Sequence, residues 1–328
     1  MFVAILLFLL GLIMLIKGGD WFVDGASGIA KRLKMSEIII GATVVSIGTT
    51  LPEVMVSATG AVTGHGEIAY GNALGSIICN TALIAALTMA IRPSVVDKHG
   101  FTLAAIFFFV AAAFYALIAV FFQKFTRIVG LILLVIFIAY MTALIVQAKC
   151  HPAVAPLEPE PGDGSEKTKK TKPVWLEIVL LIIGAALIAV GAKLLVDNGT
   201  IIAKEAGVAE SVIALTIVAL GTSLPELVTA ITALVKGHSA LSIGNIVGAN
   251  LFNIVLVAGL SITLSPFALP ASKTIAGVNS SLVVDIPVML AVMLVMAVPP
   301  MINGKLKRWQ GISLLAIYAA FVAFQFVY

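Results

Sequence analysis

Long apolar runs separated by short polar connections follow one another along the whole chain. A helix needs about 20 apolar residues to cross a bilayer, and ten runs come close to that length. They occupy residues 1–18, 36–62, 67–91, 101–123, 127–147, 175–196, 208–235, 240–264, 279–299 and 309–327. We therefore predict ten membrane-spanning helices.

The runs favour an all-α membrane protein over a membrane β-barrel. Strands of such a barrel alternate apolar and polar residues over about ten positions, and the runs here are unbroken. Inside lipid, an unbroken apolar run satisfies its own backbone only as a helix. The first run has no basic residue before it and no small-residue cleavage site directly after it. We expect it to remain as the first helix and not to be cleaved as a signal peptide.

The composition also indicates an integral membrane protein. Of the 328 residues, 61% are hydrophobic and 11% charged, whereas soluble domains carry about 25% charged residues. The net charge of +4 comes without a cluster of basic and aromatic residues, so we expect no nucleic-acid partner. Cys79 falls in a predicted span and Cys150 in a polar connection, which speaks against a disulfide or a cysteine metal site.

The two halves of the chain are similar to each other in sequence. A shift of 173 residues aligns residues 11–80 with residues 184–253 without a gap, and places the LPE motif at 51–53 on the one at 224–226. The shift spans five predicted helices, an odd number, so matching residues enter the membrane from opposite sides. We predict two inverted five-helix repeats. The domains are then a first repeat at 1–147, a cytoplasmic linker at 148–174 and a second repeat at 175–328.

Basic residues set the orientation, because cytoplasmic loops are enriched in Lys and Arg. Five of the 20 basic residues lie on one set of alternate connections, and the others lie on the opposite set. The minority comprises Lys124, Arg127, Lys193, Lys204 and Lys273. This distribution predicts that both termini are outside and that the linker is in the cytoplasm. Charge follows sidedness, because Thr63 on a predicted outer turn corresponds to Lys236 on an inner one.

The composition of the linker predicts a flexible, solvated segment. It is rich in proline, glycine and charged residues, a composition that does not form a packed core. Carboxylates could bind cations there, but we expect a plain linker role for its acids, which are Glu158, Glu160, Asp163 and Glu166.

The candidate chemistry lies in two related motifs, GTTLPE at residues 48–53 and GTSLPE at residues 221–226. A proline inside a helix has no N–H to donate, and its ring pushes on the carbonyl of residue i−4. We therefore predict that each helix is broken at its proline. The break frees carbonyl oxygens near Gly48 and Thr49 in the first copy, and near Gly221 and Thr222 in the second.

Each motif also places a glutamate in an apolar run. A charged side chain at mid-membrane costs roughly 2.5–3.5 kcal/mol on insertion scales and tends to face a cavity. Neither Glu53 nor Glu226 has a basic residue nearby in its own run. Hydroxyl and amide side chains recur around them at three- or four-residue steps, which places them on shared helix faces. They are Thr43, Ser46, Thr49, Thr50, Ser57, Asn72, Ser76 and Asn80, with Thr216, Thr222, Ser223, Thr229, Asn245 and Asn253 in the second half.

Carboxylates, hydroxyls, amides and freed carbonyls are the ligands of hard cations. Two glutamates neutralise one divalent ion, and an irregular oxygen cage favours Ca²⁺ over Mg²⁺. Na⁺ ions could compete for the same oxygens. Inverted repeats with discontinuous helices at the midplane are typical of secondary transporters that work by alternating access. The structural alternative is that the two motifs are paired helix kinks with protonated glutamates, which only hold the helices together.

Three other functions stay open at this point. A proton-coupled Ca²⁺ antiporter would cycle the same glutamates through protonation. A cation channel could also use an oxygen-lined pore, although inverted duplication favours a carrier. An intramembrane enzyme is disfavoured because no HExxH or GxSxG motif is present.

The remaining acids and histidines have structural interpretations. Glu37 and Glu210 stand at predicted helix starts, where a carboxylate favours the helix dipole. Three aspartates, Asp24, Asp197 and Asp285, lie near predicted membrane boundaries. His65 and His238 follow Gly64 and Gly237 in tight turns, and we expect them to be turn residues.

The two motifs, together with GNALGS at 71–76 and GNIVGAN at 244–250, resemble the two alpha repeats of sodium/calcium exchangers. The likeness extends over nearly the whole ten-helix chain. It implies an antiporter in the cell membrane, not an enzyme, that transports Ca²⁺ and Na⁺ and has no prosthetic group. It also implies that helices 1 and 6 slide against the rest, where Gly18 and Gly191 stand at matching positions. We expect a monomer in the lipid bilayer.

The resemblance implies the ligand set as well. Ca²⁺ would be held by Glu53, Glu226 and the main-chain carbonyls of Thr49 and Thr222. Na⁺ sites would share these glutamates with further groups, namely Thr50, Ser223, Ser76, and carbonyls near Ser46 and Ala219. Asn80 and Asn253 would complete the central cluster.

The sequence departs from the family pattern at three positions. Ala249 lacks the hydroxyl present at Ser76, Ile77 replaces an expected asparagine, and Asn253 stands where some relatives carry aspartate. These departures leave the Na⁺ count and the participation of K⁺ or H⁺ open. The linker is too short for the regulatory Ca²⁺-binding domains of large animal exchangers.

Overall fold

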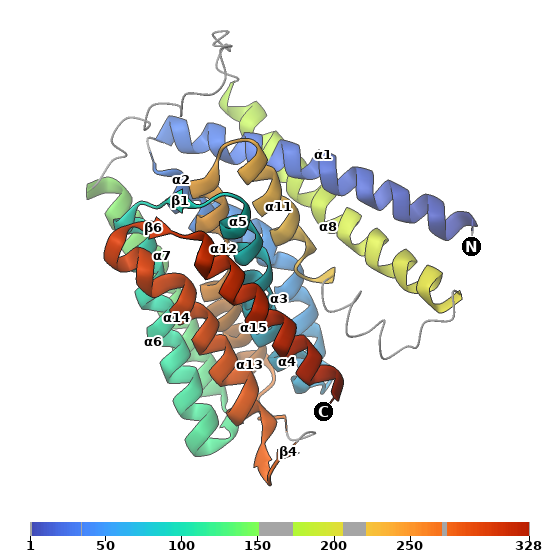
Figure 1. Ribbon diagram of the computed structural model, residues 1–328, viewed down its shortest axis with the longest axis vertical. Helices are drawn as coiled ribbons and strands as arrows, with labels where there is room; N and C mark the ends of the chain where they lie inside the picture. Colours follow the sequence, from blue (N-terminus) through green and yellow to red (C-terminus); the bar gives the residue numbers. More distant parts are fainter. Residues whose placement is uncertain (1, 34, 151–172, 206–220, 271–273, 328) are drawn as a thin grey trace.

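The computed structural model describes residues 2–33, 35–150, 173–205, 221–270 and 274–327, and almost all of them are helical (Figure 1). Within these ranges, eight helical stretches are long and apolar enough to cross a membrane. They correspond to eight of the ten predicted runs. The seventh run is described from Gly221 onward and contains a 12-residue helix, and the tenth run forms a 20-residue helix. The expectation of an all-helical membrane protein is confirmed.

The first half contains five helical stretches and two short strands. Its elements are α1 (Phe2–Leu33), α2 (Glu37–Ile40), η1 (Gly41–Val45), α3 (Ser46–Val62), α4 (Gly66–Cys79), η2 (Asn80–Ala85), α5 (Ala86–Ile91), β1 (Ser94–Val95), α6 (Lys98–Phe122), β2 (Lys124–Phe125) and α7 (Arg127–Cys150). The segments named η are π-helical turns inside continuous helices, and such turns occur frequently at functional sites.

The second half repeats much of this order. Its elements are α8 (Val174–Glu205), α11 (Leu224–Val235), α12 (Ser239–Phe252), η4 (Asn253–Ala258), α13 (Gly259–Leu264), β3 (Phe267–Ala268), β4 (Thr274–Ile275), β5 (Val278–Asn279), η5 (Ser281–Asp285), α14 (Ile286–Asn303), β6 (Lys305–Leu306) and α15 (Arg308–Val327). The π-helical turns η2 and η4 begin at Asn80 and Asn253, which are equivalent residues of the two halves.

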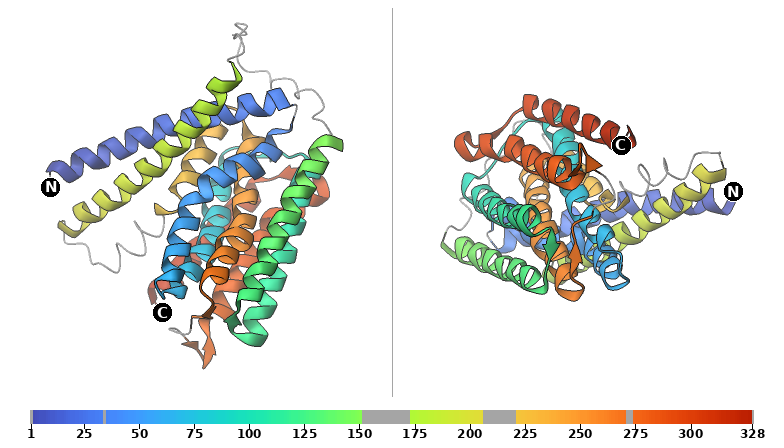
Figure 2. Two further views of the ribbon diagram at one scale, coloured as in Figure 1. Left: turned by 180° about the vertical axis from the view of Figure 1, so that it is seen from behind. Right: turned by 90° about the horizontal axis from the view of Figure 1, so that it is seen from below.

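The long helices α1 and α8 lie side by side and extend away from the other helices (Figures 1 and 2). Glycines let their backbones approach closely, as in many membrane helix pairs. A Cβ atom on Gly11 would lie 2.8 Å from the carbonyl oxygen of Gly191, and one on Gly18 would lie 3.0 Å from that of Gly184. From the first contact to the second, residue numbers rise along α1 and fall along α8. The two helices are therefore antiparallel.

Helices α4 and α12 lie within the bundle formed by the other elements. The stretch 239–264 is the most buried of the candidate spans. Aromatic side chains fill the space toward α6 and α7, where the ring of Tyr115 stacks on Phe125 with centroids 4.5 Å apart and Tyr140 packs against Phe252. This packing fixes the positions of the helices that carry the polar stripes.

Each of two small sheets joins one strand from each half. Strand β1 pairs with β6, with Ser94 opposite Leu306, and β2 pairs with β3, with Lys124 opposite Ala268. The third sheet is the β4–β5 hairpin. Its two turn residues, Ala276 and Gly277, have positive φ angles, as a type I′ turn requires.

Several helices are longer than their apolar runs. Helix α1 continues to Leu33, although the apolar run ends at residue 18, and α8 continues to Glu205 beyond residue 196. The extension of α1 buries Phe22 and Val23, so tertiary packing supports helix where the local sequence is polar. Cys150 also belongs to α7 and not to a polar connection as expected.

The acids outside the LPE motifs have ordinary partners, in agreement with their structural interpretation. Glu37 lies 2.7 Å from Nδ1 of His238, and Asp197 lies 2.9 Å from Nζ of Lys193. Asp285 accepts a hydrogen bond from Gln325. Glu210 lies outside the described residues.

Lys236 links the turn after α11 to α1. Its Nζ lies 2.7 Å from the Asp24 carboxylate and 3.3 Å from that of Asp20. Arg32 and Glu177 form a further ion pair at 2.6 Å between the end of α1 and the start of α8. Gly28 lies next to the Glu177 carboxylate. Because Gly28 has no side chain, this carboxylate fits against α1 without steric overlap.

Replacing Gly18 by leucine should separate α1 from α8. The added side chain meets backbone atoms of α8, and overpacking of this kind costs about 1–3 kcal/mol. We expect a lower melting temperature in detergent. Ile13→Phe, at a side chain that is 58% exposed on the same helix, is the control and should leave the melting temperature near that of the wild type. Equal melting temperatures for both variants would contradict this packing.

Candidate cation site

Four helical segments bring the predicted polar residues together inside the bundle. Helix α3 packs against η4, and α11 packs against η2, so each segment that carries an LPE motif contacts the segment that begins with an asparagine in the other half. Helix α3 also contacts α11 directly. The site is therefore built jointly by the two halves.

Glu53 and Glu226 are the central residues of this site. Both side chains are 0% exposed, and the two carboxyl groups lie close enough to interact with one another. Within the described part of the chain, none of their four carboxylate oxygens has a hydrogen-bond partner. Burying an ionised carboxylate without a partner is strongly unfavourable, so these two groups are stable only when they are protonated or neutralised by cations.

Equivalent polar atoms of the two halves share this lack of partners. Buried side-chain atoms for which the described ranges supply no hydrogen bond include the hydroxyls of Thr50 and Ser223 and all amide atoms of Asn80 and Asn253. Buried polar groups in proteins are normally hydrogen-bonded. A set of unpartnered oxygens around two carboxylates matches the donor chemistry of Na⁺ and Ca²⁺.

Other predicted residues are engaged in packing between helices. The hydroxyl of Ser46 lies 2.7 Å from the carbonyl oxygen of Gly41 and 2.9 Å from that of Asn245. The hydroxyl of Thr49 lies 3.2 Å from Oδ1 of Asn245. Asn72 donates to the carbonyl oxygen of Glu53 and to the hydroxyl of Ser57. These bonds hold α3 against α4 and α12.

The structure brings together most of the predicted ligand residues. Ten of them lie within the described ranges, and of these only Thr222 is not fully buried. The buried ones are Ser46, Thr49, Thr50, Glu53, Ser76, Asn80, Ser223, Glu226 and Asn253. Ala219 and Thr216 lie outside the described residues.

The predicted helix break is wrong for the first motif. Helix α3 is continuous from Ser46 to Val62 with Pro52 inside it. The irregular backbone lies about two turns before Pro52, in the π-helical η1, and a single lost donor at Pro52 does not end a helix packed on several sides. In the second motif, Thr222 and Ser223 form a turn and α11 begins at Leu224, with Pro225 in its first turn.

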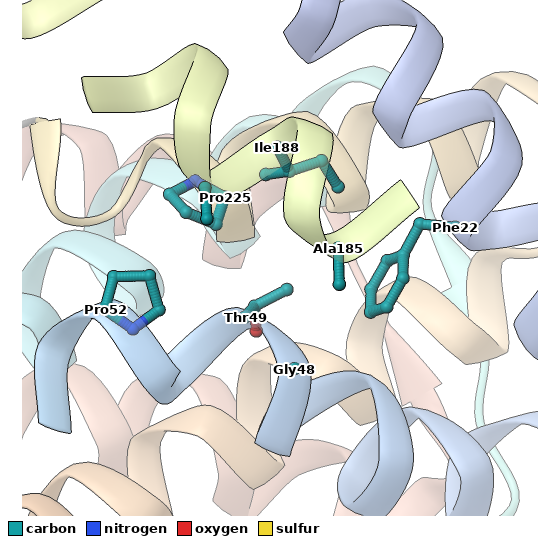
Figure 3. A pocket seen from close by; sticks show the side chains of 8 residues that line it. Phe22, Gly48, Thr49, Pro52, Ala185, Ile188 and Pro225 are labelled. Atoms are coloured by element: carbon teal, nitrogen blue, oxygen red, sulfur yellow. The ribbon is translucent and has the colours of Figure 1, made fainter. Parts of the chain in front are cut away.

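A narrow crevice runs beside both prolines (Figure 3). Pro52 and Pro225 lie on one side of it and Phe22 of α1 on the other, with Ala185 and Ile188 of α8 between them. The backbone at Gly48 approaches the Phe22 ring closely. The LPE motifs therefore lie directly against the α1–α8 pair.

One buried polar contact near the site was not predicted. Nδ2 of Asn250 lies 2.7 Å from the hydroxyl of Thr81, and both residues are fully buried. The only sequence signal was an asparagine three residues before Asn253 in an apolar run. The partner, Thr81, resembles any threonine in a membrane helix.

Comparison with known proteins identifies the family. Residues 3–146 and 176–327 match the family described as sodium/calcium exchanger protein. The chain belongs to this family. It is 31% identical to the sodium/calcium exchanger MaX1 of Methanosarcina acetivorans, over 99% of both chains. It is 35% identical to the inner membrane protein YrbG of Escherichia coli, over 81% of each.

Solved structures agree with this assignment. The structure of the sodium-calcium exchanger NCX_Mj soaked with 2.5 mM Na⁺ and 0.1 mM Ca²⁺ superposes with a TM-score of 0.79 at 34% identity, over 98% of both chains. NCX_Mj soaked with 10 mM Na⁺ and no Ca²⁺ gives a TM-score of 0.80 at 33% identity. The exchanger is thus a multi-pass membrane antiporter of a Ca²⁺- and Na⁺-transporting family, and not an enzyme.

Gly248 of the exchanger should tolerate no side chain. An added Cβ would overlap Oγ of Ser46 and would lie 2.6 Å from Cα of Ala42. We expect Gly248→Ala to lower the free energy of unfolding by about 1–3 kcal/mol, measured by denaturant titration in detergent. Adding Ser46→Ala removes the nearest atom and should recover part of the loss. A single variant as stable as the wild type would refute this contact.

Proposed function

We propose that this protein exchanges Na⁺ for Ca²⁺ across the cell membrane by alternating access, with Glu53 and Glu226 binding the transported ions. One observation carries the proposal: two fully buried carboxylates, one from each half, lie near each other, and their oxygens have no hydrogen-bond partner by geometry among the described residues. A protein that only needed stability would pair or remove these charges. Family membership supports the choice of ions.

The charge of the site gives a reason for competition between the ions. One Ca²⁺ or two Na⁺ ions balance two carboxylates, so the two species exclude each other from a shared site. A third Na⁺ would leave the loaded carrier positive and make exchange electrogenic. Further ligands in this proposal are the carbonyls of Thr49, Thr222, Ser46 and Ala219, the hydroxyls of Thr50, Ser223 and Ser76, and the amides of Asn80 and Asn253.

We further propose ten spanning helices in two inverted repeats, at 1–147 and 175–328, with 148–174 as the linker. Reciprocal contacts support the inversion. Gly11 meets Gly191, while Gly18 meets Gly184, and a shift of 173 residues converts one of these pairs into the other. The strand pairs behave in the same way, because β3 is the equivalent of β1 at that shift, and each pairs with a strand of the opposite half.

Alternating access in this proposal is a movement of the α1–α8 pair against the bundle. The crevice beside Pro52 and Pro225 lies between this pair and the LPE segments, so sliding of the pair would open or close a path to the carboxylates. The excess of basic residues on alternate connections supports a cytoplasmic linker and termini on the outside in this proposal. The exchanger acts as a monomer in this scheme, because one chain supplies both carboxylates.

The test is Ca²⁺ uptake into proteoliposomes loaded with Na⁺, K⁺ or H⁺. We expect uptake to follow an outward Na⁺ gradient alone. Glu53→Gln and Glu226→Gln should each reduce it by at least ~30-fold, the equivalent of about 2 kcal/mol. Asp197→Asn removes an exposed carboxylate on α8 and should retain wild-type uptake.

The melting temperature is a second readout, which distinguishes loss of ion binding from misfolding of the variants. Binding of Ca²⁺ to the native state raises the melting temperature by mass action, and this rise should vanish in both glutamine variants while their melting temperatures without ions remain measurable. Uptake driven by a pH gradient alone would replace the proposal with the proton-coupled antiporter. Full activity of the glutamine variants would refute the site.

Lys236 provides a test of one contact that restrains α1 against the bundle. Its ion pairs join the turn after α11 to Asp20 and Asp24 on α1. Lys236→Met should loosen this end of α1 and increase amide hydrogen exchange there by about 3-fold, as expected for pairs worth up to about 1 kcal/mol. Lys193→Met breaks only a pair within α8 and is the control. Unchanged exchange in α1 would argue against a contact that restrains it.

A further inference from the structure

Three buried side chains from three elements contact one another beside the candidate cation site. Asn250 on α12 donates from Nδ2 to the hydroxyl oxygen of Thr81 on η2, at 2.7 Å. The sulfur of Met293 on α14 lies 3.2 Å from the same nitrogen and 3.3 Å from the same hydroxyl. All three residues have 0% exposure. We call this contact the Thr81 triad.

The donors of the triad are all used. The two hydrogens of Nδ2 have the hydroxyl of Thr81 and the sulfur of Met293 as acceptors, and the hydroxyl hydrogen also has the sulfur. Sulfur is a weak acceptor, so the bond between Asn250 and Thr81 carries most of the directionality. Buried bonds of this kind are strengthened by their low-dielectric surroundings.

The triad lies next to both asparagines of the site. Thr81 directly follows Asn80, and Asn250 precedes Asn253 by three residues, which is nearly one helical turn. Elements η2 and α12 pack against each other. A displacement of one element along the other would therefore shift Asn80 relative to Asn253 and would strain or break the bond.

The contact is present on one side of the site only. At a shift of 173 residues, Thr81 corresponds to Ile254 and Asn250 corresponds to Ile77. Both isoleucines are fully buried in the apolar core. Ile77 and Ile254 thus show that apolar side chains are sufficient to pack these positions. A buried polar pair costs desolvation free energy, but its hydrogen bond fixes the relative position of the two helices.

We infer that Thr81 and Asn250 are positioning residues of the exchanger. Their bond sets the register of η2 against α12 and thereby the spacing of the asparagine amides around the transported cations. The consequence is an effect on apparent ion affinity and not only on stability. This inference rests on the proposed site at Glu53 and Glu226.

The experiment compares half-saturating ion concentrations in reconstituted transport. Thr81→Val and Asn250→Leu each remove the bond at nearly constant volume. A net hydrogen bond is worth about 0.5–1.5 kcal/mol, so we expect each variant to raise the half-saturating Ca²⁺ and Na⁺ concentrations by about 3- to 10-fold. The maximal rate should change less. The matched controls are Ile254→Val and Ile77→Leu, which should leave the half-saturating concentrations unchanged.

Exchanging the two residues provides a rescue. The double variant Thr81→Asn with Asn250→Thr keeps one amide and one hydroxyl across the same interface. We expect its half-saturating concentrations to return to within about 3-fold of the wild type, a coupling that independent sites would not show. Melting temperatures without ions should be recorded for every variant, because a purely structural role would move these and leave the ion dependence unaltered.

Two outcomes would overturn the inference. One is unchanged half-saturation in Thr81→Val and Asn250→Leu, and the other is a loss of maximal rate and melting temperature without any change in half-saturation. Glu53→Gln, assayed in parallel, separates this result from a failure of the proposed function. If Glu53→Gln abolishes uptake while the triad variants keep normal half-saturation, only the positioning role is wrong.

Discussion

The burial of two carboxylates without basic partners is the constraint on which this architecture depends. Glu53 and Glu226 are 0% exposed, and such groups are stable only when neutralised or bound by cations. Their surroundings, made of hydroxyls and amides with unused oxygens, suit hard cations better than protein donors. Under the proposed function, cation binding would also stabilise the folded bundle, because a ligand that binds the native site stabilises it.

The site exists only when both halves of the chain are assembled. Each LPE segment packs against the π-helical turn of the other half. Two of the small antiparallel sheets, β1–β6 and β2–β3, also join a strand from one half to a strand from the other. The glycine contacts between α1 and α8 repeat this reciprocity at the edge of the bundle. Neither half on its own brings two glutamates together. The repeat in the sequence therefore supplies the two carboxylates of the site, one from each half.

Departures from the repeat make the two sides of the site chemically different. Lys236 ties one turn to α1, where the other half has Thr63. Thr81 and Asn250 form a hydrogen bond, where the equivalent positions hold two isoleucines. Under the proposed alternating access, the inward and outward openings would therefore be held closed by different contacts, and their energies need not match.

The sequence by itself determined the membrane class, the helical fold and most of the proposed ligand residues. Apolar runs of spanning length leave the helix as the only solution in lipid, and a glutamate in such a run stands out because its burial is costly. Only the tertiary structure decided that α3 runs unbroken through Pro52, that α1 and α8 extend far beyond their apolar runs, and that Thr81 bonds to Asn250. These features depend on packing and hydrogen bonds between residues far apart in the chain, which local propensity does not encode.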